Sequence, residues 1–157
     1  MIEPVRKSVL VPLKPDQAFT LFTDRIADWW PIETHSLSAN RLKEASRGLM
    51  IEPHVGGHII EDCADGETRP WATVTAWEPG RRLTVSWYVG RPESEATEVD
   101  IRFKEAEDGT RLELTHAGFE VLGHDAQSTR DGYDTGWVGV LSDKFAIHCR
   151  KLASKAA

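Results

Sequence analysis

This sequence has little of what marks secreted, membrane-spanning or disulfide-stapled proteins. Its two cysteines, Cys63 and Cys149, lie far apart and outside any C-x-x-C motif, so we expect no disulfide and two reduced thiols in the core. No segment approaches the roughly 18 consecutive apolar residues that a membrane-spanning helix needs. The first residues contain no apolar stretch typical of a secretory signal. These absences predict a cytoplasmic protein without a membrane segment.

The net charge and the absence of known motifs exclude further classes of protein. A net charge of −6 and a pI of about 5.5 do not suit a nucleic-acid partner or an anionic membrane, which both attract basic proteins. The sequence has no G-x-S-x-G nucleophile elbow and no glycine-rich phosphate loop, and nothing in it requires a cofactor. His54 and His58 are separated by Gly56-Gly57, which rules out the one-face spacing of a helical metal pair. We interpret them and the nearby Glu61 as surface polarity, and we expect no metal.

The spacing of apolar residues predicts one α+β domain over residues 1–157. A strand over residues 4–11 precedes an amphipathic helical segment, which breaks near Asp24; we expect Asp24 to cap a second short helix. A long, partly ordered loop follows over residues 32–45. Alternation then predicts six strands, over residues 47–52, 58–63, 69–77, 83–89, 99–104 and 111–116. The last helix begins between Asp125 and Asp134 and carries apolar residues at steps of three and four to Leu152.

This order of elements predicts an antiparallel, twisted sheet of about seven strands, wrapped on the long C-terminal helix, with two short helices after the first strand. Such a sheet cannot always fill the space beside the helix, so we expect a ligand cavity between them.

Six tryptophans are many for a chain of this size. Trp87 has the parity of Leu83 and Val85 on its strand, so we expect it to line the cavity. Trp71 and Trp77 share a parity with two threonines, which predicts that they lie on the convex face of the sheet. An exposed indole pair there would suit a dimer interface, and the sequence leaves monomer and homodimer open.

Several motifs in order resemble the bacterial relatives of the activator of Hsp90 ATPase, the AHSA1-like family. They are Trp29-Trp30-Pro31, His35-Ser36, EPHVGG at 52–57, WATVTAWEPGRRL at 71–83, GTRLELTH at 109–116 and Gly136-Trp137. The resemblance implies the helix-grip fold of the START/Bet v 1-like (SRPBCC) superfamily, whose members enclose a deep hydrophobic pocket. It says little about activity, because a fold does not fix a function. The eukaryotic activators carry an additional N-terminal domain that this chain lacks, so Hsp90 is not expected as a partner.

The expected cavity defines the candidate site. We predict that it is lined by residues of the sheet, the C-terminal helix and the mouth: Trp30, His35, Val85, Trp87, Ile101, Leu114, His116, Trp137, Leu141, Phe145 and His148. His116 and His148 lie on apolar faces. Each is either a satisfied core histidine, a polar anchor for a ligand, or a general base.

Three functions remain open at this point. The leading hypothesis is a cytosolic protein that binds a hydrophobic or amphipathic small molecule. The second is an enzyme of the cyclase or hydrolase type that uses a pocket histidine, and the third is a co-chaperone or regulatory interaction protein.

Overall fold

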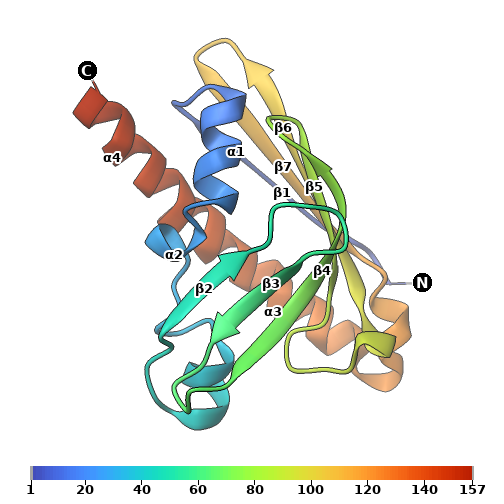
Figure 1. Cartoon of the computed structure of the whole chain (residues 1–157). Helices are drawn as coiled ribbons and strands as arrows, with labels where there is room; N and C mark the ends of the chain where they lie inside the picture. Colours follow the sequence, from blue (N-terminus) through green and yellow to red (C-terminus); the bar gives the residue numbers. More distant parts are fainter. Residues whose placement is uncertain (1, 157) are drawn as a thin grey trace.

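A seven-stranded antiparallel sheet forms the centre of the computed structural model, which describes residues 2–156 (Figure 1). The spatial order is β1-β7-β6-β5-β4-β3-β2, so only β1 and β7 are neighbours that are distant in sequence. The strands are β1 (Val5–Val11), β2 (Gly48–Ile51), β3 (His58–Asp62), β4 (Thr68–Glu78), β5 (Arg82–Trp87), β6 (Thr97–Ala106) and β7 (Gly109–Ala117). The predicted order of strands and helices along the chain, the antiparallel sheet of seven strands and the fold class are confirmed.

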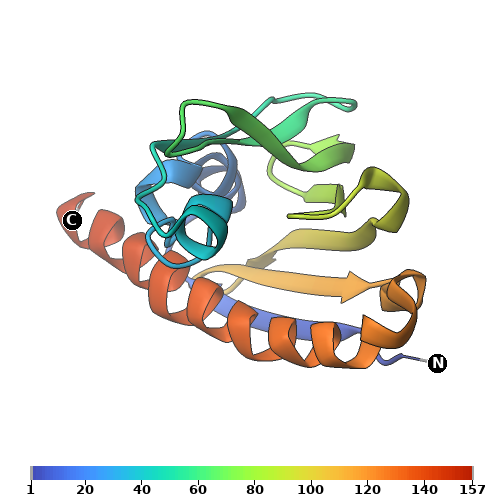
Figure 2. The same ribbon diagram turned by 90° about the horizontal axis from the view of Figure 1, so that it is seen from below.

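The helices lie on the concave side of this sheet. Figure 2 shows the C-terminal helix running beside β1 and β7, with β2, β3 and β4 on the opposite side of the molecule. Between them lie α1 (Pro15–Thr23), α2 (Ile26–Trp29) and the helical turn η1 (Ser38–Leu42), which orders part of the expected loop. Short turns η2 (Glu93–Glu95) and η3 (Phe119–Asp125) complete the connections. The predicted cap at Asp24 is wrong, because α2 begins after Arg25 and has no side-chain cap.

The long C-terminal helix is interrupted by a π-helical segment. It consists of α3 (Ala126–Val138), the π segment η4 (Gly139–Phe145) and α4 (Ala146–Ala156). A π turn is wider than an α turn, so it shifts the faces of the residues that follow. Cys149 is therefore completely buried, whereas His148 is only half-buried. The apolar stripe predicted to include His148 passes through its neighbour instead.

Two β-bulges in β4 bring both of its tryptophans to the concave side. The pairing register shifts between Ile59 and Ile60 opposite Trp71, and again within residues 74–76 before Trp77. Each extra residue reverses the parity of a strand. Trp71 is consequently 1% exposed, and Trp77 packs edge-on against Phe19 at a ring-centroid distance of 5.1 Å. The predicted convex-face indole pair is wrong.

Glu61 is also inside, where it anchors the segment between α2 and β2. Its carboxylate accepts hydrogen bonds from the backbone N–H groups of Leu37 (2.8 Å) and Ser38 (3.1 Å), from the Ser38 hydroxyl (2.6 Å) and from the Trp71 indole (3.0 Å). Burial alone would raise the pKa of this carboxyl, but the hydrogen bonds from Ser38, Leu37 and Trp71 together lower it. The carboxylate therefore stays ionised without a salt-bridge partner, and its assignment to surface polarity is wrong.

Replacing Glu61 by glutamine should lower the free energy of unfolding by about 2–4 kcal/mol near neutral pH, because the new amide NH₂ would face hydrogen-bond donors. The folded state lowers the pKa of Glu61, so the carboxylate stabilises the fold above the ordinary value of 4.5, and this stabilisation is lost as the pH falls through the folded pKa. In urea unfolding, the difference between wild type and Glu61→Gln should therefore shrink in acid.

The exposed Glu67 provides the matched control, since Glu67→Gln should change stability by no more than about 0.5 kcal/mol. A difference for Glu61→Gln that did not depend on pH would contradict an ionised Glu61.

Candidate functional site

Four tryptophans from four elements meet between the sheet and the C-terminal helix, and we call them the tryptophan cluster. Trp30 follows α2, Trp71 is in β4, Trp87 in β5 and Trp137 in α3. The ring centroid of Trp30 lies 5.5 Å from that of Trp71, 6.2 Å from that of Trp87 and 5.8 Å from that of Trp137. None of the four is more than 7% exposed. The Trp87 ring likewise lies 6.1 Å from that of Trp71 and 5.6 Å from that of Trp137, so Trp30 and Trp87 each contact the other three.

This cluster almost fills the space where a ligand cavity is expected. The remaining cavity measures about 10 Å³, close to the minimum that one water molecule needs. Its walls are apolar and aromatic and come from α1, α2, the sheet and α3: Phe22, Ile26, Trp30, Ile59, Trp71, Leu83, Val85, Trp87, Val99, Ile101 and Trp137. In this conformation the interior holds side chains rather than an open pocket.

Five of the predicted site residues line this cavity, namely Trp30, Val85, Trp87, Ile101 and Trp137. Leu114, Leu141 and Phe145 are buried in the surrounding core. Leu83 and Val99 also line the cavity. They lie on the same sides of their strands as the predicted Val85 and Ile101, so the alternation along the strands could have identified both. Alternation did not point to Trp71, because a bulge turns it inward; the neighbouring Pro70 was the available signal of that bulge.

Two predicted residues, His35 and His148, lie away from the cavity. The His35 side chain is exposed and bonds the Thr34 hydroxyl at 2.7 Å, and only its backbone carbonyl contacts the cluster. His148 borders a separate surface hollow together with Asp28 and Glu33.

Every indole N–H of the cluster has an acceptor. Trp30 donates to the His35 carbonyl at 2.8 Å, and Trp71 donates to Glu61. Trp87 donates to the Tyr133 hydroxyl at 2.9 Å, and Trp137 donates to His116 Nδ1 at 3.0 Å. The acceptors of Trp71, Trp87 and Trp137 belong to the sheet or the C-terminal helix. The acceptor of Trp30 belongs to its own connecting segment.

His116 is a completely buried histidine with both ring nitrogens engaged. Because an indole N–H can only donate, Nδ1 of His116 must accept from Trp137 and carry no proton. Nε2 then carries the proton and donates it to Thr97 Oγ1 at 2.7 Å, while the Thr97 hydroxyl donates to the Trp87 carbonyl at 3.2 Å. Burial lowers the pKa of His116 to about 3. This arrangement leaves no free basic nitrogen near neutral pH.

Tyr133 adds a polar group to the edge of the cluster, and it lies four residues before Trp137, so the helical spacing could have identified it. Its ring lies 4.6 Å from the His116 ring and stacks on Trp137 at 6.4 Å between centroids. Burial raises the pKa of the Tyr133 phenol, although the hydrogen bond from Trp87 opposes this. The phenol is therefore protonated near neutral pH.

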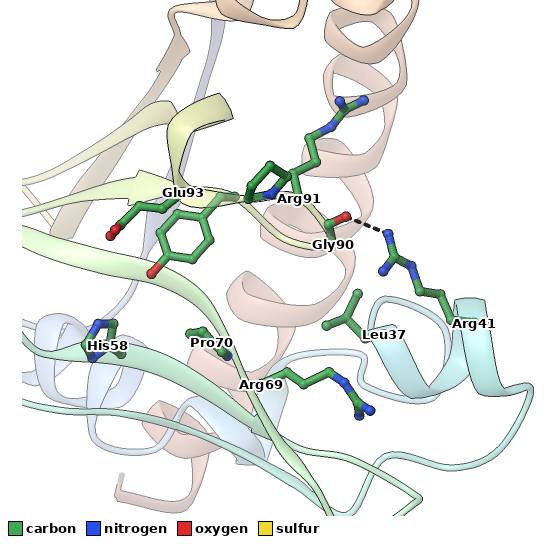
Figure 3. A pocket seen from close by; sticks show the side chains of 10 residues that line it. Leu37, Arg41, His58, Arg69, Pro70, Gly90, Arg91 and Glu93 are labelled. Carbon is green, nitrogen blue, oxygen red and sulfur yellow. Dashed lines mark hydrogen bonds between the residues drawn. The ribbon is translucent and has the colours of Figure 1, made fainter.

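A surface groove lies outside the cluster, where η1 meets the β5–β6 connection (Figure 3). Its volume is about 590 Å³, and its lining includes Leu37, Arg41, Arg69, Gly90 and Arg91. Arg41 donates to the Gly90 carbonyl, and a Cβ at Gly90 would lie 2.8 Å from the Arg41 guanidinium. Glycine at this position thus permits the close approach of the two segments. Leu37, which is part of the core, separates the groove from the interior.

Within residues 2–156, no group of three or more His, Cys, Asp or Glu side chains is arranged to hold a metal ion. No helix in the same range is long and apolar enough to span a membrane.

We expect His116 to keep one proton, on Nε2, from neutral pH down to the onset of acid unfolding. The imidazole of the unfolded chain takes up a proton near its ordinary pKa of 6.5, and the folded one does not, so His116 makes the fold less stable as the pH falls below that value. Nitrogen-15 NMR of the ring distinguishes the Nε2–H tautomer directly. A folded-state titration midpoint near 6.5 would contradict this description.

Comparison with known proteins places this arrangement in a family. The profile described as activator of Hsp90 ATPase homolog 1-like protein matches residues 12–148. A comparison with curated proteins gives no match. Among solved structures, the anthrahydroquino-γ-pyrone synthase Txn09 is 35% identical over 80% of this chain and 82% of that chain, with a TM-score of 0.58.

Two further structures are similar in fold. The AHSA1-like protein of Aeromonas hydrophila is 19% identical, with 96% of this chain and 94% of that chain covered and a TM-score of 0.67. The Aha1 dimer of Colwellia psychrerythraea is 17% identical, with 90% and 92% covered and a TM-score of 0.65. The chain therefore belongs to the activator of Hsp90 ATPase homolog 1-like family and has its helix-grip fold.

Proposed function

We propose that this chain is a cytosolic protein that binds a planar, hydrophobic or amphipathic small molecule at the tryptophan cluster. The observation that carries this proposal is the interior wall of tilted and edge-on aromatic rings beside an apolar cavity. Aromatic rings offer large contact areas and favourable geometries to another planar ring system. The 35% identity to Txn09, whose name as an anthrahydroquino-γ-pyrone synthase denotes a fused-ring product, supports a ligand of this shape.

Because the cavity of about 10 Å³ is too small for any such ligand, a side chain must move to admit it. Trp30 is the side chain best suited to move. Its one side-chain hydrogen bond is to the His35 carbonyl, five residues along the same connecting segment and before residues 37–38, which Glu61 holds. An outward movement of residues 30–35 would therefore break neither interaction. A planar ligand in the place of Trp30 would restore the contacts with Trp71, Trp87 and Trp137.

A synthase- or cyclase-type activity on the bound molecule is the second candidate, and the identity to Txn09 favours it. In such an enzyme His116 would order the cavity wall rather than act as a general base, because both of its ring nitrogens are occupied.

The proposal is tested with 2-acetylnaphthalene as the probe and the six indole N–H signals of the NMR spectrum as the readout. Binding at the cluster should shift the signals of Trp30, Trp87 and Trp137 in a saturable way. Trp30→Ala should bind the probe about tenfold more tightly, because the competing indole is gone. The same change should lower the free energy of unfolding by about 3–5 kcal/mol.

Trp77→Ala is the matched control, since it removes an indole that packs on Phe19 and does not line the cavity, and it should leave the affinity unchanged. If Trp30→Ala does not fold, the same binding measurement is made with Trp30→Phe. The absence of saturable shifts in the wild-type protein, or shifts confined to residues of the surface groove, would overturn the proposal. Native mass spectrometry of the purified protein would in addition identify any molecule it retains.

A further inference from the structure

The hydroxyl group of Tyr133 has an unused hydrogen-bonding capacity. Its oxygen accepts the Trp87 indole N–H at 2.9 Å, but its own proton has no acceptor anywhere in residues 2–156. Tyr133 is only partly buried, and its ring packs on the outer side of Trp87 and Trp137. The phenol therefore has a free donor at the edge of the tryptophan cluster.

Two glycines flank Tyr133 on α3, where packing does not require them. A Cβ built at Gly132 or at Gly136 would meet nothing within 4 Å. Glycine inside a helix is about 0.8–1.0 kcal/mol less favourable than alanine. The fold thus gives up stability at both positions, and the space beside Tyr133 stays open.

A positive charge faces the same region. Arg91, in the β5–β6 connection, acts on the Tyr133 hydroxyl electrostatically, and its guanidinium is held by Glu95 at 2.9 Å. Arg91 also belongs to the lining of the surface groove (Figure 3). The partial negative charge of a carbonyl oxygen is compatible with this place.

We propose that the Tyr133 hydroxyl donates a hydrogen bond to a carbonyl oxygen of the bound molecule, whose flat body lies against the backbone of Gly132 and Gly136. This inference rests on the proposed function and narrows it to a class of ligand, aromatic ketones and related quinone-type molecules. The hydrogen bond from Trp87 polarises the phenol and makes it a better donor. Burial raises the pKa of the phenol, which keeps the donated proton in place near neutral pH.

A pair of probes with nearly the same shape tests the role of the phenol. 2-Acetylnaphthalene has a carbonyl oxygen, and 2-ethylnaphthalene has a methylene group at that position. Tyr133→Phe should weaken the binding of the acetyl probe by about five- to tenfold, the usual effect of one hydrogen bond, and leave the binding of the ethyl probe unchanged. Tyr88→Phe, which removes a hydroxyl bonded to Thr73 in the outer groove, is the matched control and should affect neither probe.

Gly136→Ala tests the open space separately. This variant should have a melting temperature about 2–4 °C higher, because alanine favours the helix, and yet bind both probes several-fold more weakly. Thr135→Ala, on the exposed side of the same helical turn, should bind both probes normally.

The possible failures are distinguishable. If Tyr133→Phe affects the two probes equally, or neither, the proposed hydrogen bond is overturned while binding at the cluster stands. If Gly136→Ala binds as the wild type does, the ligand does not lie along α3. If neither probe binds the wild-type protein, the proposed function fails and this inference fails with it.

Discussion

The interior of this protein depends on the buried carboxylate of Glu61. It gathers the backbone of residues 37–38, the Ser38 hydroxyl and the Trp71 indole around one charge, and so joins the segment after α2 to β3 and β4. A buried charge is tolerated only when hydrogen bonds replace its hydration. Four donors do so here, and they hold residues 37–38, at the far end of the segment that follows Trp30. The path of the chain past the tryptophan cluster therefore depends on a polar interaction as well as on apolar packing.

The tryptophans combine tight packing with polar ties to different elements. Trp137 is tied through His116 to β7, and Trp87 is tied through Tyr133 to α3, so the hydrogen bonds cross the interior in both directions. Buried indole N–H groups usually find such partners, and each partner fixes the orientation of the ring. The cluster consequently has a defined arrangement of faces and edges, which is a requirement for selecting a planar ligand. Only Trp30 is tied within its own segment.

Much of the fold follows from the sequence, since alternation along the strands and the three-to-four spacing of the last helix depend on local residues. The exceptions have local physical causes. The bulges in β4 invert the parity of Trp71 and Trp77; Pro70 is a sequence signal for the first bulge, and no residue type marks the second. The π segment moves the inward face from His148 to Cys149. Glu61 looked like an ordinary strand carboxylate because its donors come from distant residues. The size of the cavity depends on how whole side chains fill a volume, which a one-dimensional pattern does not contain.

The place of Trp30 in the cluster has a consequence for selectivity. If a ligand takes the position of this indole, the protein carries its own internal competitor at a very high local concentration. The apparent affinity then equals the intrinsic affinity reduced by the fraction of molecules in which Trp30 has withdrawn. Small lipophilic molecules with few contacts would be rejected, because they make weaker interactions than the indole they must replace. A binding site that is filled by a side chain in this way requires a minimum intrinsic affinity. Only a ligand that makes more favourable contacts with the surrounding rings than the Trp30 indole does would displace it.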